Sequence, residues 1–100
     1  MRLNHEIRDY GYLLEKLRII NYRMAIDEGD ARTRLSAYCF QLYLLATRDF
    51  PDKFKCLHTE LKNIECPRNG VIHGLRNKRA SGIIEKLLDL EIFLSKEMEM

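Results

Sequence analysis

Apolar residues recur at steps of three and four along nearly the whole chain. This spacing places them on one face of an α-helix, whereas half-buried strands would show alternation with a period of two, which is absent. The pattern therefore predicts an all-α protein without a sheet. In the first segment only Asn21 interrupts the apolar stripe, which is formed by Leu3, Ile7, Tyr10, Leu14, Leu17 and Met24.

Turn and capping residues divide this pattern into four helices. Gly29 is suited to stop the first helix and Asp30 to cap the second. Pro51 fits the first position of a third helix, and Pro67 predicts a break because the residue before a proline favours extended geometry. The predicted helices cover residues 3–27, 31–48, 51–66 and a last stretch that begins between residues 67 and 71 and ends near residue 96, with a kink or interruption at residues 81–82.

Four amphipathic helices with short connections predict an antiparallel four-helix bundle. The chain has 100 residues, 46% of them hydrophobic and 32% charged, which indicates a single globular domain over residues 1–100. Apolar runs stay well below the ~18 residues of a membrane span, and no secretory signal opens the chain, so we expect a soluble cytoplasmic protein. The apolar residues of 83–94 cover more than one helix face, which predicts a partner helix and, most simply, a homodimer.

Positive charge gathers in one segment, although the formal net charge is only +2. Residues 67–79 contain one histidine, no acid and four basic residues, namely Arg68, Arg76, Lys78 and Arg79. A local basic patch of this kind favours a phosphate-bearing ligand, and a solvated basic turn is the simpler alternative. Arg76, Lys78 and Arg79 are the residues that we expect to hold a nucleic-acid backbone.

The cysteines and histidines do not form a familiar metal motif. Cys39, Cys56 and Cys66 are odd in number, and the chain lacks a Cys-x-x-Cys pair. Together with the missing secretory signal, this predicts free thiols in a reducing compartment. We therefore expect no metal and no cofactor.

The stretch from Arg68 to Gly74 combines residues that suit phosphate chemistry. Arg68 carries a permanent charge whose fork matches phosphate oxygens, Asn69 adds an amide, and His73 titrates near neutral pH. The stretch follows a proline break and is predicted to open the last helix, where free backbone N–H groups favour an anion. On a regular helix residues five apart lie ~140° apart, so Arg68 and His73 would converge only at a distorted helix start.

This stretch resembles the signature of the HEPN superfamily, which is Arg, four residues and His, with a polar residue directly after the Arg. Arg68, Asn69 and His73 match the signature position by position. The resemblance implies a helical bundle that dimerises. Many members of the superfamily are metal-independent endoribonucleases, whereas others are inactive nucleotide- or RNA-binding domains, often in toxin–antitoxin, phage-defence or RNA-processing systems. The resemblance assigns proton transfer to His73, phosphorane stabilisation to Arg68 and positioning to Asn69. It also suggests a cognate antitoxin or other protein partner.

The match to that family departs in two places. Toxin members paired with a nucleotidyltransferase antitoxin commonly carry a tyrosine two residues after the histidine, where this chain has Leu75. The acidic residue that some families contribute from an early helix is not identified by the sequence, and its candidates are Glu6, Asp9, Glu15 and Asp27.

Three other functions compete with RNA cleavage. The basic patch would suit a module that binds a nucleotide, RNA or a phosphorylated partner without chemistry, although no aromatic residue lies within residues 67–82 to stack on a base. The apolar face of residues 83–94 would suit a helical interaction protein. A helix-turn-helix over residues 70–88 is the weakest alternative, because it lacks a convincing turn between two short helices.

Overall fold

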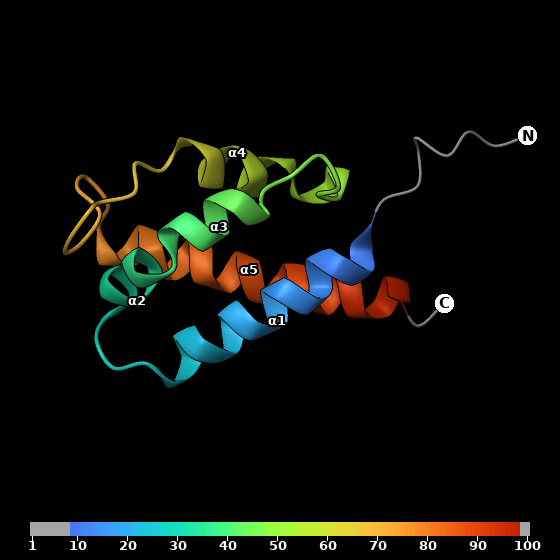
Figure 1. Cartoon of the computed structure of the whole chain (residues 1–100), viewed down its shortest axis with the longest axis horizontal. Coiled ribbons are helices and arrows are strands. Elements are labelled where there is room, and N and C mark those ends of the chain that lie inside the picture. The colour runs from blue at the N-terminus through green and yellow to red at the C-terminus, as the bar shows by residue number, and fades with distance from the viewer. Residues whose placement is uncertain (1–8, 99–100) are drawn as a thin grey trace, which may run out of the picture.

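The computed structural model describes residues 9–98, and this part of the chain is all-helical and without strands (Figure 1). The all-α prediction is confirmed. The elements are α1 (Tyr10–Ile26), α2 (Ala31–Ala37), α3 (Cys39–Leu45), a 3-10 turn η2 (Asp52–Phe54), α4 (Lys55–Asn63) and α5 (Asn77–Met98). The first helix was predicted to begin at residue 3, which lies outside the described residues, as do Ile7 and Glu6.

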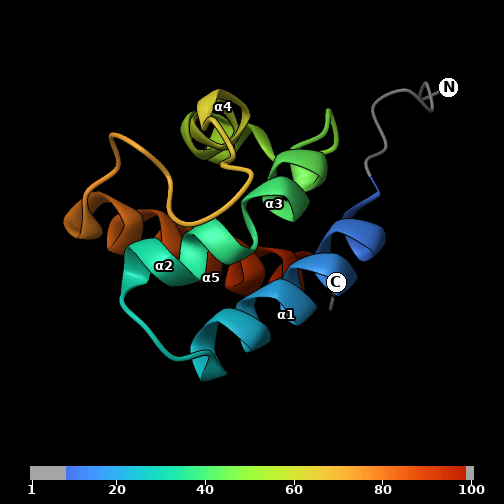
Figure 2. The same ribbon diagram turned by 60° about the vertical axis from the view of Figure 1, so that its left-hand side comes forward.

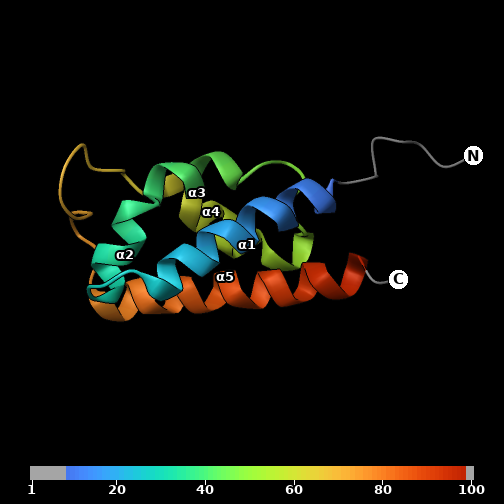
Figure 3. The same ribbon diagram turned by 60° about the horizontal axis from the view of Figure 1, so that its bottom comes forward.

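The antiparallel pair α1 and α5 forms the base of the fold (Figure 3). Of the predicted apolar seam of α1, Leu14, Leu17 and Met24 are buried and Tyr10 is partly buried. This seam faces the buried leucines of α5 at positions 87, 90 and 94. Asn21, which interrupts that seam, is also buried. Its Nδ2 donates to the Leu87 carbonyl oxygen at 3.2 Å and to Glu91 Oε1 at 2.8 Å, which satisfies the amide nitrogen, whereas the buried Oδ1 accepts no hydrogen bond.

The prediction of one helix over residues 31–48 is wrong, because the chain bends at Tyr38 and separates α2 from α3. Tyr38 leaves helical geometry with ψ 14°, and its side-chain hydroxyl donates to Asp27 Oδ2 at 2.7 Å. Two residues earlier, the Ser36 hydroxyl donates to the Arg32 carbonyl oxygen at 2.7 Å. Serine bonds of this kind bend helices. The bend turns α3 toward α4.

The last helix also begins later than predicted. It starts at Asn77 rather than between residues 67 and 71, and residues 64–76 form a loop. Gly70 and Gly74 have φ values of 80° and 75°, in the left-handed region that favours glycine and cannot continue a helix. Gly82 interrupts nothing, because α5 runs through residues 81–82 without a break.

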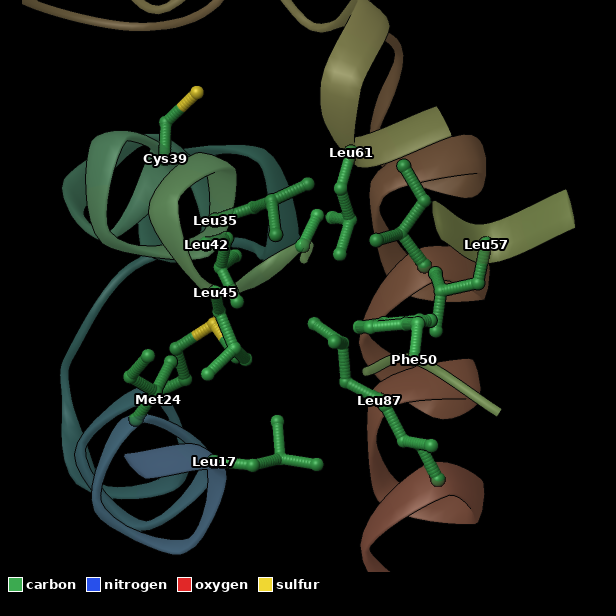
Figure 4. Packing of buried hydrophobic residues seen from close by; sticks show 14 of the residues in the cluster. Leu17, Met24, Leu35, Cys39, Leu42, Leu45, Phe50, Leu57, Leu61 and Leu87 are labelled. Atoms are coloured by element: carbon green, nitrogen blue, oxygen red, sulfur yellow. The ribbon is translucent and has the colours of Figure 1, made fainter. Parts of the chain in front are cut away.

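The buried residues form one cluster to which all five α-helices contribute (Figure 4). In this view Leu17 and Met24 of α1 face Leu87 of α5, while Leu57 and Leu61 of α4 close the other side. Most of the predicted core positions therefore lie where the helical periodicity placed them.

Cys39 and Cys66 are joined in a disulfide, with their Cα atoms 5.6 Å apart. The expectation of free thiols is wrong for this pair and holds for Cys56, which is free and exposed. The physical reason is tertiary: the chain leaving α4 passes over the start of α3. Spacing along the sequence does not reveal that return.

Exposed apolar side chains occur on α5 and on a second surface. Leu88 and Ile92 of α5 are 44% and 55% exposed, in line with the apolar surplus expected for residues 83–94. A larger group was not anticipated, namely Tyr12, Ile19, Tyr22, Ile26, Phe40, Tyr43 and Leu44 of α1 and α3. Within residues 9–98, no helix combines the length and apolar character required to cross a bilayer.

Candidate functional site

The loop of residues 64–76 carries Arg68, Asn69 and His73 and runs over α2 before it reaches the start of α5 (Figure 2). It is held at three points. Cys66 is bonded to Cys39, and the side chains of Ile72 and Leu75 are buried in the core cluster. The loop is thus fixed to the helices on both sides of His73.

Two side chains of α2 hold the loop backbone at Ile72. The Ile72 amide donates to Ser36 Oγ at 2.9 Å, and Arg32 Nε donates to the Ile72 carbonyl oxygen at 3.0 Å. Because Ser36 in turn donates to the Arg32 carbonyl oxygen, the two anchors belong to one hydrogen-bonded group. Both polar groups of this buried loop residue are therefore satisfied.

The beginning of α5 is bound to the beginning of α2. Asn77 Nδ2 donates to Asp30 Oδ2 at 3.1 Å, and the Arg32 amide donates to Asn77 Oδ1 at 2.9 Å. Asp30 also accepts from the Thr33 amide at 2.9 Å, which confirms it as the N-cap of α2. Hydrogen bonds from Thr33, and then from Asn77, lower the pKa of Asp30 below its ordinary 3.8. A carboxylate whose pKa is lower in the folded state stabilises the fold at pH values above its ordinary pKa. This stabilisation is lost as the pH falls through the folded-state pKa, so it is fully present at neutral pH.

The three predicted catalytic residues lie on the exposed part of this loop. Arg68, Asn69 and His73 are exposed, and within residues 9–98 their side chains form no hydrogen bond or ion pair. The expectation that they open a helix is wrong, since α5 begins four residues after His73. The angular separation expected on a regular helix therefore does not apply. The structure places the three on one loop and does not join them by a direct contact.

The predicted backbone-binding residues, by contrast, are brought together. Arg76, Lys78 and Arg79 line an open hollow of about 570 Å³, with Gly74 beside them. They flank the first turn of α5, which contains no acidic residue, so the positive end of the helix dipole adds to their charge. Arg79 is partly compensated, since its Nε lies 3.2 Å from Glu60 Oε2. This hollow adjoins His73 through Gly74 and suits a phosphate group.

Sequence reasoning missed the residues that hold the site in place. Arg32, Ser36 and Asn77 act on the loop from other elements, and nothing in their local pattern marks them. Of the candidate acids, Asp9 caps α1 and Asp27 accepts the Tyr38 hydroxyl, while Glu6 is outside the described residues. In the described part of the chain, no three His, Cys, Asp or Glu side chains gather as a metal site.

Replacing Ser36 with alanine is expected to loosen the loop at Ile72. The Ile72 amide would lose its acceptor in a buried position, which costs about 1 kcal/mol and increases local opening roughly fivefold. Amide hydrogen exchange at Ile72 measures this directly. The exposed Ser81 of α5 provides the matched control, and equal exchange at Ile72 in Ser36→Ala and Ser81→Ala would show that the bond does not restrain the loop.

No protein-family model matches this chain, and neither the curated proteins nor the solved structures contain a match to it.

Proposed function

We propose that the protein is a metal-independent endoribonuclease of HEPN-like architecture that cuts RNA through Arg68, Asn69 and His73. One observation carries the proposal. A loop whose backbone is anchored by α2 presents an exposed histidine and arginine beside a basic hollow, without partners for either side chain in the described residues. Exposed, unpaired groups on an anchored backbone are available to a substrate phosphate.

The chemistry requires a proton acceptor, a proton donor and stabilisation of negative charge. His73 takes the proton of a ribose 2′-hydroxyl, and the 2′-oxygen then attacks the adjacent phosphorus. The bond from phosphorus to the 5′-oxygen breaks, and that oxygen takes up a proton, leaving a 2′,3′-cyclic phosphate and a 5′-hydroxyl. Arg68 stabilises the charge that develops on the phosphorane oxygens, Asn69 positions the phosphate, and Arg76, Lys78 and Arg79 hold the neighbouring backbone.

The proposal includes a homodimer in the cytoplasm. In the proposed fold, α2 and α3 count as one bent arm of an antiparallel four-helix bundle. The exposed Leu88 of α5 provides an apolar contact point for a second copy. In the proposed dimer the two His73 side chains share one cleft, where one accepts a proton and the partner's His73 donates one. The resemblance to toxin and defence proteins adds a cognate antitoxin or other protein partner, without the regulatory tyrosine that Leu75 replaces.

The direct test is cleavage of end-labelled RNA by the purified protein in EDTA. We expect products with 2′,3′-cyclic phosphate ends, because the attacking group is the neighbouring 2′-hydroxyl. The same oligonucleotide with 2′-deoxyribose throughout is the control and is expected to stay intact. Cleavage of both the RNA and the 2′-deoxy oligonucleotide would contradict attack by the 2′-hydroxyl. If no RNA in a pool of varied sequences is cleaved, the nuclease is contradicted.

A second candidate is a non-catalytic module that binds a nucleotide or RNA. The observation that favours it is the grouping of Arg76, Lys78 and Arg79 around one hollow, while Arg68 and His73 do not contact each other. Under this alternative the charge of the hollow retains RNA and no product forms under any condition. If the parent protein binds RNA without cleaving it, and the Arg76→Glu variant no longer binds, the binding module is favoured over the nuclease.

A further inference from the structure

A cavity of about 450 Å³ lies between the start of α4 and the C-terminal half of α5, away from the loop of residues 64–76. Three lysines, two phenylalanines and one aspartate shape it, namely Lys53, Lys86, Lys96, Phe54, Phe93 and Asp89. Its volume is within the range of small-molecule sites, which is about 300–1,000 Å³. None of these residues has a role in the proposed cleavage.

Two aromatic rings form an apolar wall of the cavity. The ring centroids of Phe54 and Phe93 lie 5.5 Å apart, and both side chains are only partly buried. Lys53 Nζ lies 5.2 Å from the centroid of Phe93 and 6.0 Å from that of Phe54. The ammonium group therefore covers the rings in the free protein, and it must turn toward the phosphate of a ligand when a flat group stacks on them.

The charge of the cavity is mostly uncompensated. In the described part of the chain Lys86 and Lys96 form no ion pair, and Asp89 is the single acid among the lining residues. Three ammonium groups against one carboxylate leave a net positive charge of two. An anionic ligand relieves this repulsion, whereas a neutral or cationic ligand does not.

The cavity lies on the same face of α5 as part of the basic hollow. Arg79, Lys86 and Phe93 follow one another at intervals of seven residues, which corresponds to about two helical turns and ~10 Å per interval. Residues at this interval share one side of a helix. A chain that carries a phosphate at every unit can therefore pass from the hollow at Arg79 to the lysines of the cavity.

We propose that this cavity binds a nucleotide of single-stranded RNA, with the base against Phe93 and Phe54 and the phosphate among Lys53, Lys86 and Lys96. The site supplies the stacking surface that residues 67–82 lack. An acidic peptide would satisfy the lysines but would leave the aromatic wall without a flat partner, so an RNA base fits the arrangement better. The proposal extends the proposed function by naming single-stranded RNA as its substrate, and the binding itself requires no cleavage.

The test is the fluorescence anisotropy of a labelled ten-residue oligouridylate, measured with the His73→Ala protein to prevent turnover. Lys86→Glu is expected to weaken binding about tenfold and to flatten the salt dependence, because a phosphate contact is lost. Lys55→Glu is the matched control, since Lys55 is exposed on α4, does not line the cavity and undergoes the same change of charge. We expect it to change binding less than twofold. Equal effects of the two substitutions would overturn the site.

The aromatic wall is tested separately with Phe93→Leu, which keeps an apolar side chain against Phe54. We expect binding of the oligouridylate to weaken about fivefold, and binding of an abasic strand of equal length to remain unchanged, because stacking requires a base. Equal losses for both strands would overturn the stacking role. If the parent protein binds RNA but does not cleave it, only the proposed nuclease activity is contradicted. If the parent cleaves RNA and Lys86→Glu binds RNA as tightly as the protein with Lys86, only the proposed binding site in this cavity is contradicted.

Discussion

Replacing His73 with alanine is expected to lower the rate of RNA cleavage by about 10²- to 10⁴-fold, the usual contribution of a positioned general acid or base. The protein should stay folded, because His73 is exposed and its side chain has no hydrogen-bond partner within residues 9–98. The rate is measured with an end-labelled oligonucleotide in EDTA. Circular dichroism and the unfolding midpoint verify the fold of the variant.

His58 provides the matched control for this experiment. Its ring packs edge-on against Phe50, with 5.2 Å between the ring centroids, and it lies on α4 rather than on the loop. His58→Ala should therefore lower the free energy of unfolding and leave the cleavage rate near that of the parent. A His73→Ala protein that cleaves as fast as the parent would remove His73 from the proposed chemistry.

Asn21→Asp is expected to destabilise the fold by about 3–5 kcal/mol at pH 7, as an unpaired buried charge does. Asn21 is 5% exposed, its Nδ2 donates to Glu91 Oε1 at 2.8 Å, and its Oδ1 has no hydrogen-bond partner. The new carboxylate would lose the donor, face the carboxylate of Glu91 and find no donor for either oxygen. Since domains of this size are stable by about 5–15 kcal/mol, a large share of the stability would be lost.

The destabilisation should depend on pH in a defined direction. Burial and the nearby Glu91 raise the folded-state pKa of the new carboxyl above its unfolded value of about 3.9. The folded state then binds more protons than the unfolded state, so stability falls as the pH rises from about 4 toward the folded pKa. Urea unfolding at pH 4 and pH 7 measures the difference. Asn21→Leu is the control, and its cost should hardly change with pH; equal pH dependence in both variants would contradict a buried charge.

The sequence predicts correctly those helices whose buried face is visible in the spacing of their own apolar residues. The stripe of α1 and the leucines of α5 repeat at helical spacing because both helices bury one face along their whole length. Asn21 was visible as the one polar position in its stripe, although its partners on α5 were not. Asp30 was recognised as a cap because capping is a contact within one turn of the chain.

The features that the sequence did not predict depend on contacts between distant segments. The bend at Tyr38 and the loop of residues 64–76 involve Ser36, which bonds to both its own helix and Ile72. The pairing of Cys39 with Cys66 likewise requires the path of the chain after α4. In the candidate site, the basic hollow is formed by residues that are close together in sequence. The helix expected to include Arg68 and His73 does not form there, because Gly70 and Gly74 have positive φ values.

The residues that hold the loop and the residues exposed on it are different, which has a consequence for the evolution of the sequence. The groups that hold the loop at Ile72 belong to Arg32 and Ser36, while the exposed groups belong to Arg68, Asn69 and His73. A substitution at an exposed loop position thus removes a chemical group without touching the bonds that shape the backbone. The same framework can therefore carry different side chains at these exposed positions, with little selection against single substitutions from folding.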